Sequence, residues 1–289
     1  MTWQDPRVTS ITTRAIGLPS GEQIPVLGQG TWEMGDDDAN RADELRALRL
    51  GIDLGLTLID TAEMYGNGAS EELVAEAIEG RRDDVFLVSK VMPMNASRHG
   101  TIAACEQSLK RLQTDRIDLY LLHWRARFPV EETVEAFTAL VEAGKIRHWG
   151  VSNFDALDLA EVVSVAGGPE VASDQVLYNL SHRGIEFDLL PWCRDRGLPV
   201  MAYSPVNRGR LVRNDVVVEI AEKHAATTAQ VALAWVLRHD GVCAIPKASI
   251  PEHVRENRGA LDLVLDREDM ALLDDAFPPP AGPEPLDTA

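Results

Sequence analysis

The chain has 289 residues, of which 45% are hydrophobic and 26% are charged. Its 46 acidic residues outnumber the 28 lysines and arginines, and the net charge of −18 argues against a nucleic-acid or anionic-membrane partner. No apolar run approaches membrane-spanning length and the N-terminus lacks an apolar signal segment, so we expect a cytoplasmic protein. Cys105, Cys193 and Cys243 lie far apart in the sequence and predict neither a disulfide framework nor a zinc site.

Short apolar runs alternate with helical periodicity along most of the chain. Residues 11–17 and 23–30 flank a Leu-Pro-Ser-Gly turn and predict a hairpin ahead of the main fold. Leu45, Leu48 and Ile52 then recur at spacings of three and four, which is typical of an amphipathic helix. Further strands are predicted at 56–60, 85–90, 117–122, 146–151, 171–176, 198–202 and 242–245, and further helices near 70–80, 102–112, 134–144, 159–165, 187–193, 216–224, 228–237 and 266–277.

Counted from Val26, the pattern supplies eight apolar strands joined by helices. Buried strands connected in this way form parallel sheets, and eight of them predict a (β/α)₈ TIM barrel, here with an N-terminal β-hairpin and extra C-terminal helices. We expect one domain over residues 1–289, with a Pro-rich tail at 278–289. A doubly wound dinucleotide fold would place Gly-x-Gly-x-x-Gly at a strand-to-helix turn, and no such turn is found.

Polar residues end three consecutive predicted strands. Asp60, Lys90 and His123 stand at the ends of the second, third and fourth strands, and Tyr65 follows the second by a short loop. Taken singly, each has an ordinary structural explanation, such as a helix cap, a solvated lysine or a core histidine. Because the carboxyl ends of barrel strands face a common mouth, their combination favours an active site. A buried lysine there needs a counter-charge, and Asp60 is placed to provide it.

Several short motifs occur in order along the chain: Asp-Thr-Ala-x-x-Tyr-Gly-Asn at 60–67, Val-Ser-Lys at 88–90, Leu-His-Trp at 122–124, Gly-Val-Ser-Asn-Phe at 150–154 and Ile-Pro-Lys at 245–247. Together they resemble the aldo-keto reductase family over essentially the whole chain. The resemblance implies an NAD(P)H-dependent enzyme of the aldehyde reductase or alcohol dehydrogenase type. It would transfer hydride from NADPH to the carbonyl of an aldehyde, ketone, 2-oxoaldehyde or sugar.

The resemblance also implies roles for the three strand-end residues and for Tyr65. Tyr65 is expected to be the general acid, and the charge of Lys90 to lower the phenol pKa towards working pH. Asp60 would hold Lys90 in place and keep it charged. His123 would orient the carbonyl oxygen by a hydrogen bond.

The family's cofactor contacts carry over to thirteen positions: Ser152, Asn153, Gln175, Tyr203, Ser204, Arg208, Gly209, Arg210, Leu211, Lys247, Ser249, His253 and Asn257. The resemblance implies that Ser152, Asn153 and Gln175 contact the nicotinamide carboxamide and that Tyr203 stacks on the ring. It further implies that the segment 204–211 covers the pyrophosphate, that Lys247 and Ser249 meet the 2′-phosphate and that Asn257 contacts the adenine. Ala248 and His253 stand where the family commonly has serine and arginine. We therefore predict that the enzyme prefers NADPH and can also use NADH. The preference for NADPH should be smaller than in relatives that carry the arginine.

Trp32 and Trp124 are predicted to line the substrate pocket, by their positions after the first and fourth strands. Core positions are predicted for the tryptophans that lie within a predicted strand or helix, Trp149, Trp192 and Trp235. The loop after His123 and the C-terminal tail are short, which favours an open, shallow pocket for small aldehydes, dicarbonyls or sugars. We expect a monomer without a metal site. Two other functions stay open: an NADPH-binding redox sensor with slow turnover, and an aldolase that forms a Schiff base on Lys90.

Overall fold

A computed structural model describes residues 14–125 and 127–288. A two-stranded antiparallel hairpin precedes an eight-stranded parallel sheet, as predicted, although residues 11–13 of the expected hairpin lie outside the described part of the chain. The hairpin strands are β1 (Ala15–Gly17) and β2 (Gln23–Pro25). The strands of the large sheet are β3 (Gln29–Gly30), β4 (Leu58–Asp60), β5 (Phe86–Val91), β6 (Ile117–Leu122), β7 (Ile146–Ser152), β8 (Asp174–Leu177), β9 (Val200–Tyr203) and β10 (Val242–Ala244).

The large sheet closes on itself. Its strands follow chain order from β3 to β10, and isolated parallel bridges from Leu27 to Ala244 and from Gly30 to Lys247 join the last strand to the first. The first strand comes very close to its neighbour, since a Cβ atom at Gly28 would lie 2.6 Å from the Leu58 carbonyl oxygen. Glycine is therefore required there. The (β/α)₈ barrel predicted from the alternating pattern is confirmed.

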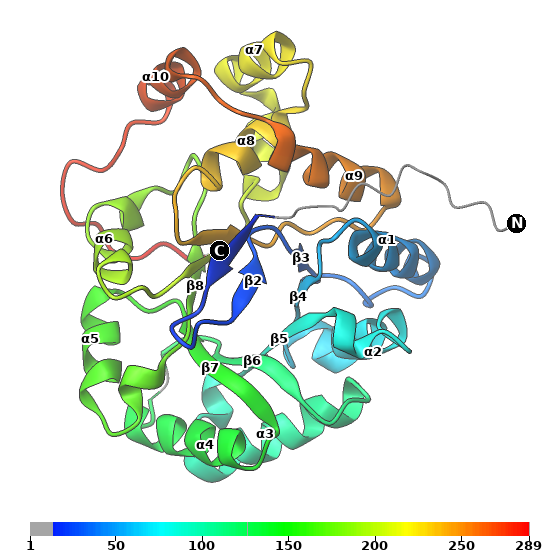
Figure 1. The fold of residues 1–289 in the computed structure, drawn as a ribbon, viewed down its shortest axis with the longest axis vertical. Coiled ribbons are helices and arrows are strands. Elements are labelled where there is room, and N and C mark those ends of the chain that lie inside the picture. Colours follow the sequence, from blue (N-terminus) through cyan, green and yellow to red (C-terminus); the bar gives the residue numbers. More distant parts are fainter. Residues whose placement is uncertain (1–13, 126, 289) are drawn as a thin grey trace, which may run out of the picture.

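Helices surround the sheet (Figure 1). They are α1 (Arg41–Asp53), α2 (Ala69–Ala77), α3 (Arg98–Arg111), α4 (Val130–Glu142), α5 (Ala156–Ser164), α6 (Leu189–Arg194), α7 (Asp215–Lys223), α8 (Thr228–Val236), α9 (Pro251–Gly259) and α10 (Arg267–Ala276). Helix α5 begins earlier than its apolar pattern indicates, because the Asp155 carboxylate accepts hydrogen bonds from the amides of Leu157 and Asp158 and caps the helix there.

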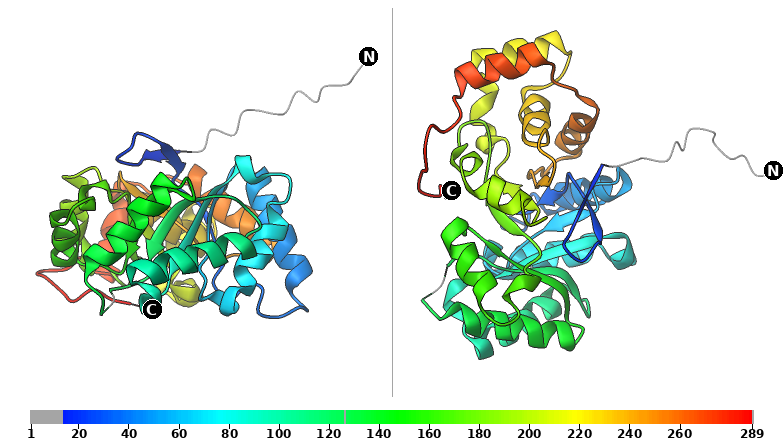
Figure 2. Two further views of the ribbon diagram at one scale, coloured as in Figure 1. Left: turned by 90° about the horizontal axis from the view of Figure 1, so that it is seen from below. Right: turned by 60° about the vertical axis from the view of Figure 1, so that its left-hand side comes forward.

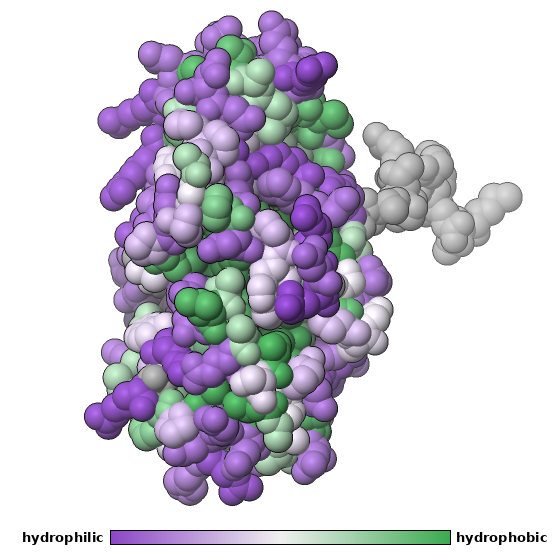
Figure 3. Space-filling model, turned by 90° about the vertical axis from the view of Figure 1, so that its left-hand side faces the viewer, coloured by the Kyte–Doolittle hydropathy of each residue, from purple (hydrophilic) through white to green (hydrophobic). Residues whose placement is uncertain are grey.

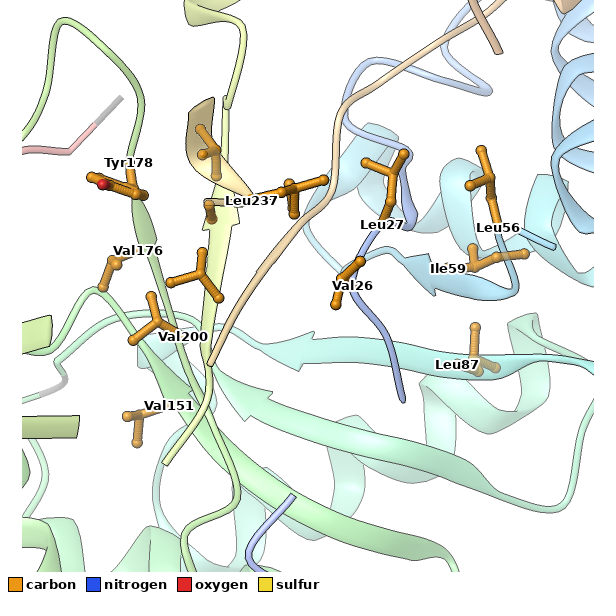
Figure 4. Packing of buried hydrophobic residues seen from close by; sticks show 14 of the residues in the cluster. Val26, Leu27, Leu56, Ile59, Leu87, Val151, Val176, Tyr178, Val200 and Leu237 are labelled. Carbon is orange, nitrogen blue, oxygen red and sulfur yellow. The ribbon is translucent and has the colours of Figure 1, made fainter. Parts of the chain in front are cut away.

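The main hydrophobic core lies between the sheet and the helices. Figure 4 shows part of it, in which Ile59, Leu87 and Val200 extend from the strands towards the surrounding helices. Trp149 and Trp235 are fully buried in this core, as predicted. Trp192 differs from the prediction: it packs on the core only partly, and the Arg196 guanidinium carbon lies 4.0 Å from its ring centre.

A second, smaller apolar cluster fills the inside of the barrel. It includes Leu58, Val88, Leu119, Leu121, Met201 and Cys243, with Leu18 and Ile24 from the hairpin region. Side chains along a strand alternate between its two faces, so a residue two positions after an inward-facing one also faces inward. Asp60 follows Leu58, and Lys90 follows Val88, at this spacing. Asp60 and Lys90 therefore lie at the carboxyl end of the barrel, above its apolar interior.

The two ends of the barrel differ. The hairpin covers one end, and the last described residues lie at the opposite end (Figure 2). None of the helices within the described residues is both long and apolar enough to cross a membrane. Hydrophilic residues cover most of the face drawn in Figure 3, with hydrophobic residues in small groups among them.

Candidate active site

Lys90 lies at the centre of the polar residues at the carboxyl end of the barrel. Its ammonium donates hydrogen bonds to Asp60 Oδ2 at 2.7 Å, to the Thr61 carbonyl oxygen at 2.9 Å and to Tyr65 Oη at 3.1 Å. Lys90 is fully buried. The three acceptors match the three N–H donors of an ammonium group, so the site holds the lysine in its charged form.

The pKa of Lys90 follows from the same contacts. Burial alone would lower it, but the Asp60 carboxylate and the Tyr65 oxygen outweigh burial and raise it above the usual value. The other oxygen of Asp60 accepts a hydrogen bond from Gln175 Nε2 at 2.7 Å. Asp60 is thus fixed from two sides and fixes Lys90 in turn.

Tyr65 reaches the site from a short 3₁₀ segment, Tyr65–Gly68, which follows β4. Within it Gly66 has φ 55°, and a Cβ atom there would lie 2.3 Å from an Asp36 oxygen, so glycine is needed at this turn. We expected Lys90 to bring the phenol pKa towards working pH. In the free protein burial is the larger effect, and despite Lys90 it raises the Tyr65 pKa above its ordinary value. The phenol therefore stays protonated, as a proton donor must.

His123 faces Tyr65 with their ring centres 5.8 Å apart. Burial, and then the nearby charge of Lys90, lower the His123 pKa to about 3. The imidazole is therefore neutral, with one N–H donor and one acceptor nitrogen. Its Nδ1 atom is buried and has no hydrogen-bond partner among residues 14–125 and 127–288. A neutral ring suits the positioning role predicted for this residue.

The residues predicted to meet the nicotinamide form one hydrogen-bonded group. Asn153 donates to the His123 carbonyl oxygen at 3.0 Å and accepts from Tyr203 Oη at 2.8 Å, and Ser152 Oγ donates to the Gln175 carbonyl oxygen at 2.8 Å. Asn153 takes a left-handed backbone conformation with φ 58°. A strained backbone conformation persists only where surrounding contacts hold it in place, and the hydrogen bonds of the Asn153 side chain do so here.

The loop after β9 carries the residues predicted near the pyrophosphate. Ser204 has φ 48°, and the 3₁₀ segment Asn207–Arg213 contains Arg208, Gly209, Arg210 and Leu211. Leu211 is buried in the main core and anchors this segment. The guanidinium carbon of Arg208 lies 4.4 Å from the centre of the Trp32 ring. Arg208 therefore meets a residue that follows β3, on a different part of the barrel rim.

The residues predicted near the adenosine lie further out, after β10. Lys247 and His253 are exposed, Ser249 is half-buried and Asn257 is buried. Among the described residues no side chain caps the N-terminus of α9, whose N-cap residue is Ile250. Its first residue, Pro251, has no N–H, so the amides of Glu252 and His253 are the ones free to bind an anion. None of the four residues predicted near the adenosine lines the mouth pocket described next, whereas the residues predicted to contact the nicotinamide do.

A pocket of about 590 Å³ opens at the mouth of the barrel. It is lined by Tyr65 and His123 and by both predicted substrate residues, Trp32 and Trp124. Sequence reasoning missed five further lining residues: Gly30, Met64, Arg125, Ile245 and Thr288. Arg125 directly follows the His-Trp pair, which is a signal that could have indicated it, whereas nothing in the sequence connects Thr288 to the mouth.

The C-terminal tail was predicted to be short, and the structure shows that it nevertheless reaches the pocket. Arg183 donates to Asp274 Oδ1 at 2.8 Å and to the carbonyl oxygen of Phe277, where the tail begins. Further on, Asp287 Oδ2 lies 2.8 Å from His182 Nδ1. These contacts bring Thr288 to the pocket wall, so the tail contributes to the pocket although it is short.

The fold and the site together define a (β/α)₈-barrel enzyme with a cluster of titratable residues at the carboxyl end of its strands. The model of the aldo/keto reductase family matches residues 26–277. The chain therefore belongs to the aldo/keto reductase family.

Individual relatives agree with this family. Methylglyoxal reductase YeaE from Escherichia coli is 54% identical over 269 residues, covering 91% of this chain and 95% of that protein. Glyoxal reductase from Bacillus subtilis is 36% identical, covering 90% and 91%. A crystal structure of an aldo/keto reductase from Klebsiella pneumoniae in complex with NADP and acetate has 50% identity and a TM-score of 0.94, covering 96% of this chain and all of that one.

Proposed function

We propose that this chain reduces the carbonyl group of small aldehydes, foremost 2-oxoaldehydes, with NADPH as the hydride donor and Tyr65 as the general acid. One contact carries the proposal: the charged Lys90 ammonium lies 3.1 Å from the Tyr65 phenol oxygen, and the phenol lines the mouth pocket. The similarity to the methylglyoxal and glyoxal reductases supports the substrate class.

The residues present fit NADPH. At the nicotinamide end, the side-chain oxygens of Gln175, Ser152 and Asn153 can accept hydrogen bonds from a carboxamide, whereas their own donors are already paired within the protein. At the other end, the exposed Lys247 and the uncapped start of α9 offer positive charge and amide donors to a phosphate. Bound NADPH would supply the hydride that the carbonyl carbon receives.

The protein's own groups manage the proton. As the carbonyl oxygen gains negative charge it takes the proton of the Tyr65 hydroxyl, and a phenolate remains. The Lys90 ammonium stabilises that phenolate from 3.1 Å until solvent returns a proton. The neutral His123 ring can donate one hydrogen bond to the same oxygen and so orient the carbonyl group.

The same contacts weigh against an aldolase. A Schiff-base lysine must be a free amine when it attacks, whereas Lys90 is buried, paired with Asp60 and has a raised pKa. Its position below Tyr65 supports an electrostatic role instead.

Activity measurements test the proposal directly. Purified protein should oxidise NADPH, followed by absorbance, when methylglyoxal or glyoxal is added, and should form one equivalent of the alcohol product for each NADPH consumed. Aldoses and simple ketones serve as comparison substrates and should react more slowly. NADPH binding without turnover of any carbonyl compound would favour the redox-sensor function and contradict the proposal.

A further inference from the structure

We propose that Arg125 is a substrate-binding residue that makes the enzyme prefer, between aldehydes of similar shape, the one that carries a carboxylate. This inference rests on the proposed carbonyl reduction and adds to it the charge of the preferred substrate. Four observations support it: the place of Arg125 in the pocket, its anchoring, an unused donor, and the charges around it.

Arg125 belongs to the pocket wall. It comes two residues after His123 at the end of β6, and it lines the same 590 Å³ pocket as His123 and Tyr65. Its side chain is 35% exposed. A carbonyl group placed at Tyr65 and His123 would therefore have a guanidinium within the same pocket.

Neighbouring residues hold the guanidinium in place. Arg125 Nη2 donates to both carboxylate oxygens of Glu161 on α5, at 2.7 and 2.8 Å. The guanidinium carbon lies 6.0 Å from the Phe154 ring centre, at the edge of the range for a cation–π contact. A side chain anchored on two sides loses less conformational freedom when it binds a ligand.

One donor of this anchored group is unused. Arg125 Nη1 is shielded from water and has no hydrogen-bond partner within residues 14–125 and 127–288. Buried donors are nearly always paired, so Nη1 would gain a hydrogen bond if the partly exposed side chain shifts to meet an acceptor of a ligand. A carboxylate is the strongest common acceptor for a guanidinium, because it binds the planar N–H groups in pairs.

The charged residues around the pocket indicate that Arg125 is the one that would bind a substrate carboxylate. Within the described part of the chain, Asp60 is the only acidic residue that lines the pocket, and it is engaged by Lys90 and Gln175. The other arginine of the lining, Arg208, sits over Trp32 in the loop proposed to cover the cofactor. Strand β6 is three strands away from both β3 and β9 in the sheet. Arg125 is therefore the cation on the side of the mouth away from that loop.

A pair of matched aldehydes tests this preference. We would measure kcat/KM at saturating NADPH for 4-carboxybenzaldehyde and for 4-methylbenzaldehyde, which have similar shapes and differ in charge. The unmodified enzyme should favour the carboxylate at least tenfold. Arg125→Gln should lower that ratio about tenfold, mainly through a higher KM for the carboxylate. Arg127→Gln is the matched control, because Arg127 is exposed, lies against Phe128 and does not line the pocket.

A measurement without any variant gives an independent check. Raising the ionic strength should lower the carboxylate preference of the unmodified enzyme, since salt screens an interaction with a partly exposed charge. An unchanged ratio in Arg125→Gln, or an equal fall in Arg127→Gln, would overturn the inference while leaving the proposed function intact. Failure to reduce either aldehyde or methylglyoxal would instead overturn the proposed function.

Discussion

Lys90 Nζ lies 3.1 Å from Tyr65 Oη, and this contact joins a fully buried charge to a phenol at the wall of the mouth pocket. The two residues come from different strands, since Lys90 is within β5 and Tyr65 follows β4. The contact therefore depends on the pairing of β4 with β5 and on Asp60, which holds the ammonium at 2.7 Å.

Removing the charge of Lys90 should abolish most of the activity. Lys90→Met should lower kcat by about 10²- to 10⁴-fold, because the phenolate formed on Tyr65 would lose its counter-charge. It should also destabilise the fold by about 3–5 kcal/mol, since Asp60 would be left buried without its partner. Kinetics and urea unfolding measure the two effects. Lys110→Met at an exposed position of α3 is the control, and retained activity in Lys90→Met would contradict the role.

His123 should not titrate during catalysis between pH 5 and 8, because burial holds its pKa at about 3. In the unfolded chain its pKa returns to about 6.5, so the unfolded state binds a proton that the folded state refuses as pH falls below that value. The free energy of unfolding should therefore fall more steeply with acidification in the unmodified protein than in His123→Gln. Unfolding titrations between pH 6.5 and 5 measure this slope, and parallel slopes would argue against a neutral His123.

Asp174 should lower the free energy of unfolding as pH rises. Its side chain is fully buried and makes no hydrogen bond of ordinary geometry with the described residues. Burial raises the pKa of Asp174 well above the usual value, although the amides of Phe154 and Gln175 oppose this shift. The folded state keeps a proton that the unfolded state releases above about pH 4. Asp174→Asn should therefore gain stability relative to the unmodified protein as pH increases. Urea unfolding at pH 5 and 7 tests this, and an equal difference at both would contradict it.

Cofactor preference should depend on the charges after β10. Lys247→Met should raise the KM for NADPH about tenfold and leave the KM for NADH within twofold, because only NADPH carries the 2′-phosphate. His253→Arg should have the opposite effect on NADPH, since arginine brings a permanent charge and paired donors. Both positions are exposed, so little change in stability is expected. A lower KM for NADH than for NADPH in the unmodified enzyme would overturn the predicted preference.

The sequence predicted the barrel and its four polar strand-end residues because both follow from local patterns. Apolar runs of strand length locate β4 and β5, and the two-residue spacing from Leu58 to Asp60 and from Val88 to Lys90 places the polar side chains inside. The tail could not be predicted in this way. Thr288 reaches the pocket through contacts such as His182 with Asp287, which join residues 105 positions apart and leave no local pattern.

The direction of the Tyr65 pKa shift also could not be predicted from the sequence. Lys90 does favour the phenolate, as expected, but the depth of burial decides the direction of the pKa shift. Burial depends on how Tyr65, His123 and the surrounding loops pack together, which only the folded structure provides.

The central claim is that Tyr65 delivers the proton, and one substitution tests it most directly. The kcat for methylglyoxal reduction should be compared between Tyr65→Phe and Tyr120→Phe, which removes the hydroxyl of a fully buried tyrosine outside the site. We expect Tyr65→Phe to lose about 10²- to 10⁴-fold of kcat while NADPH still binds, and Tyr120→Phe to stay close to the unmodified enzyme. Carbonyl reduction at an unchanged rate in Tyr65→Phe would contradict the account.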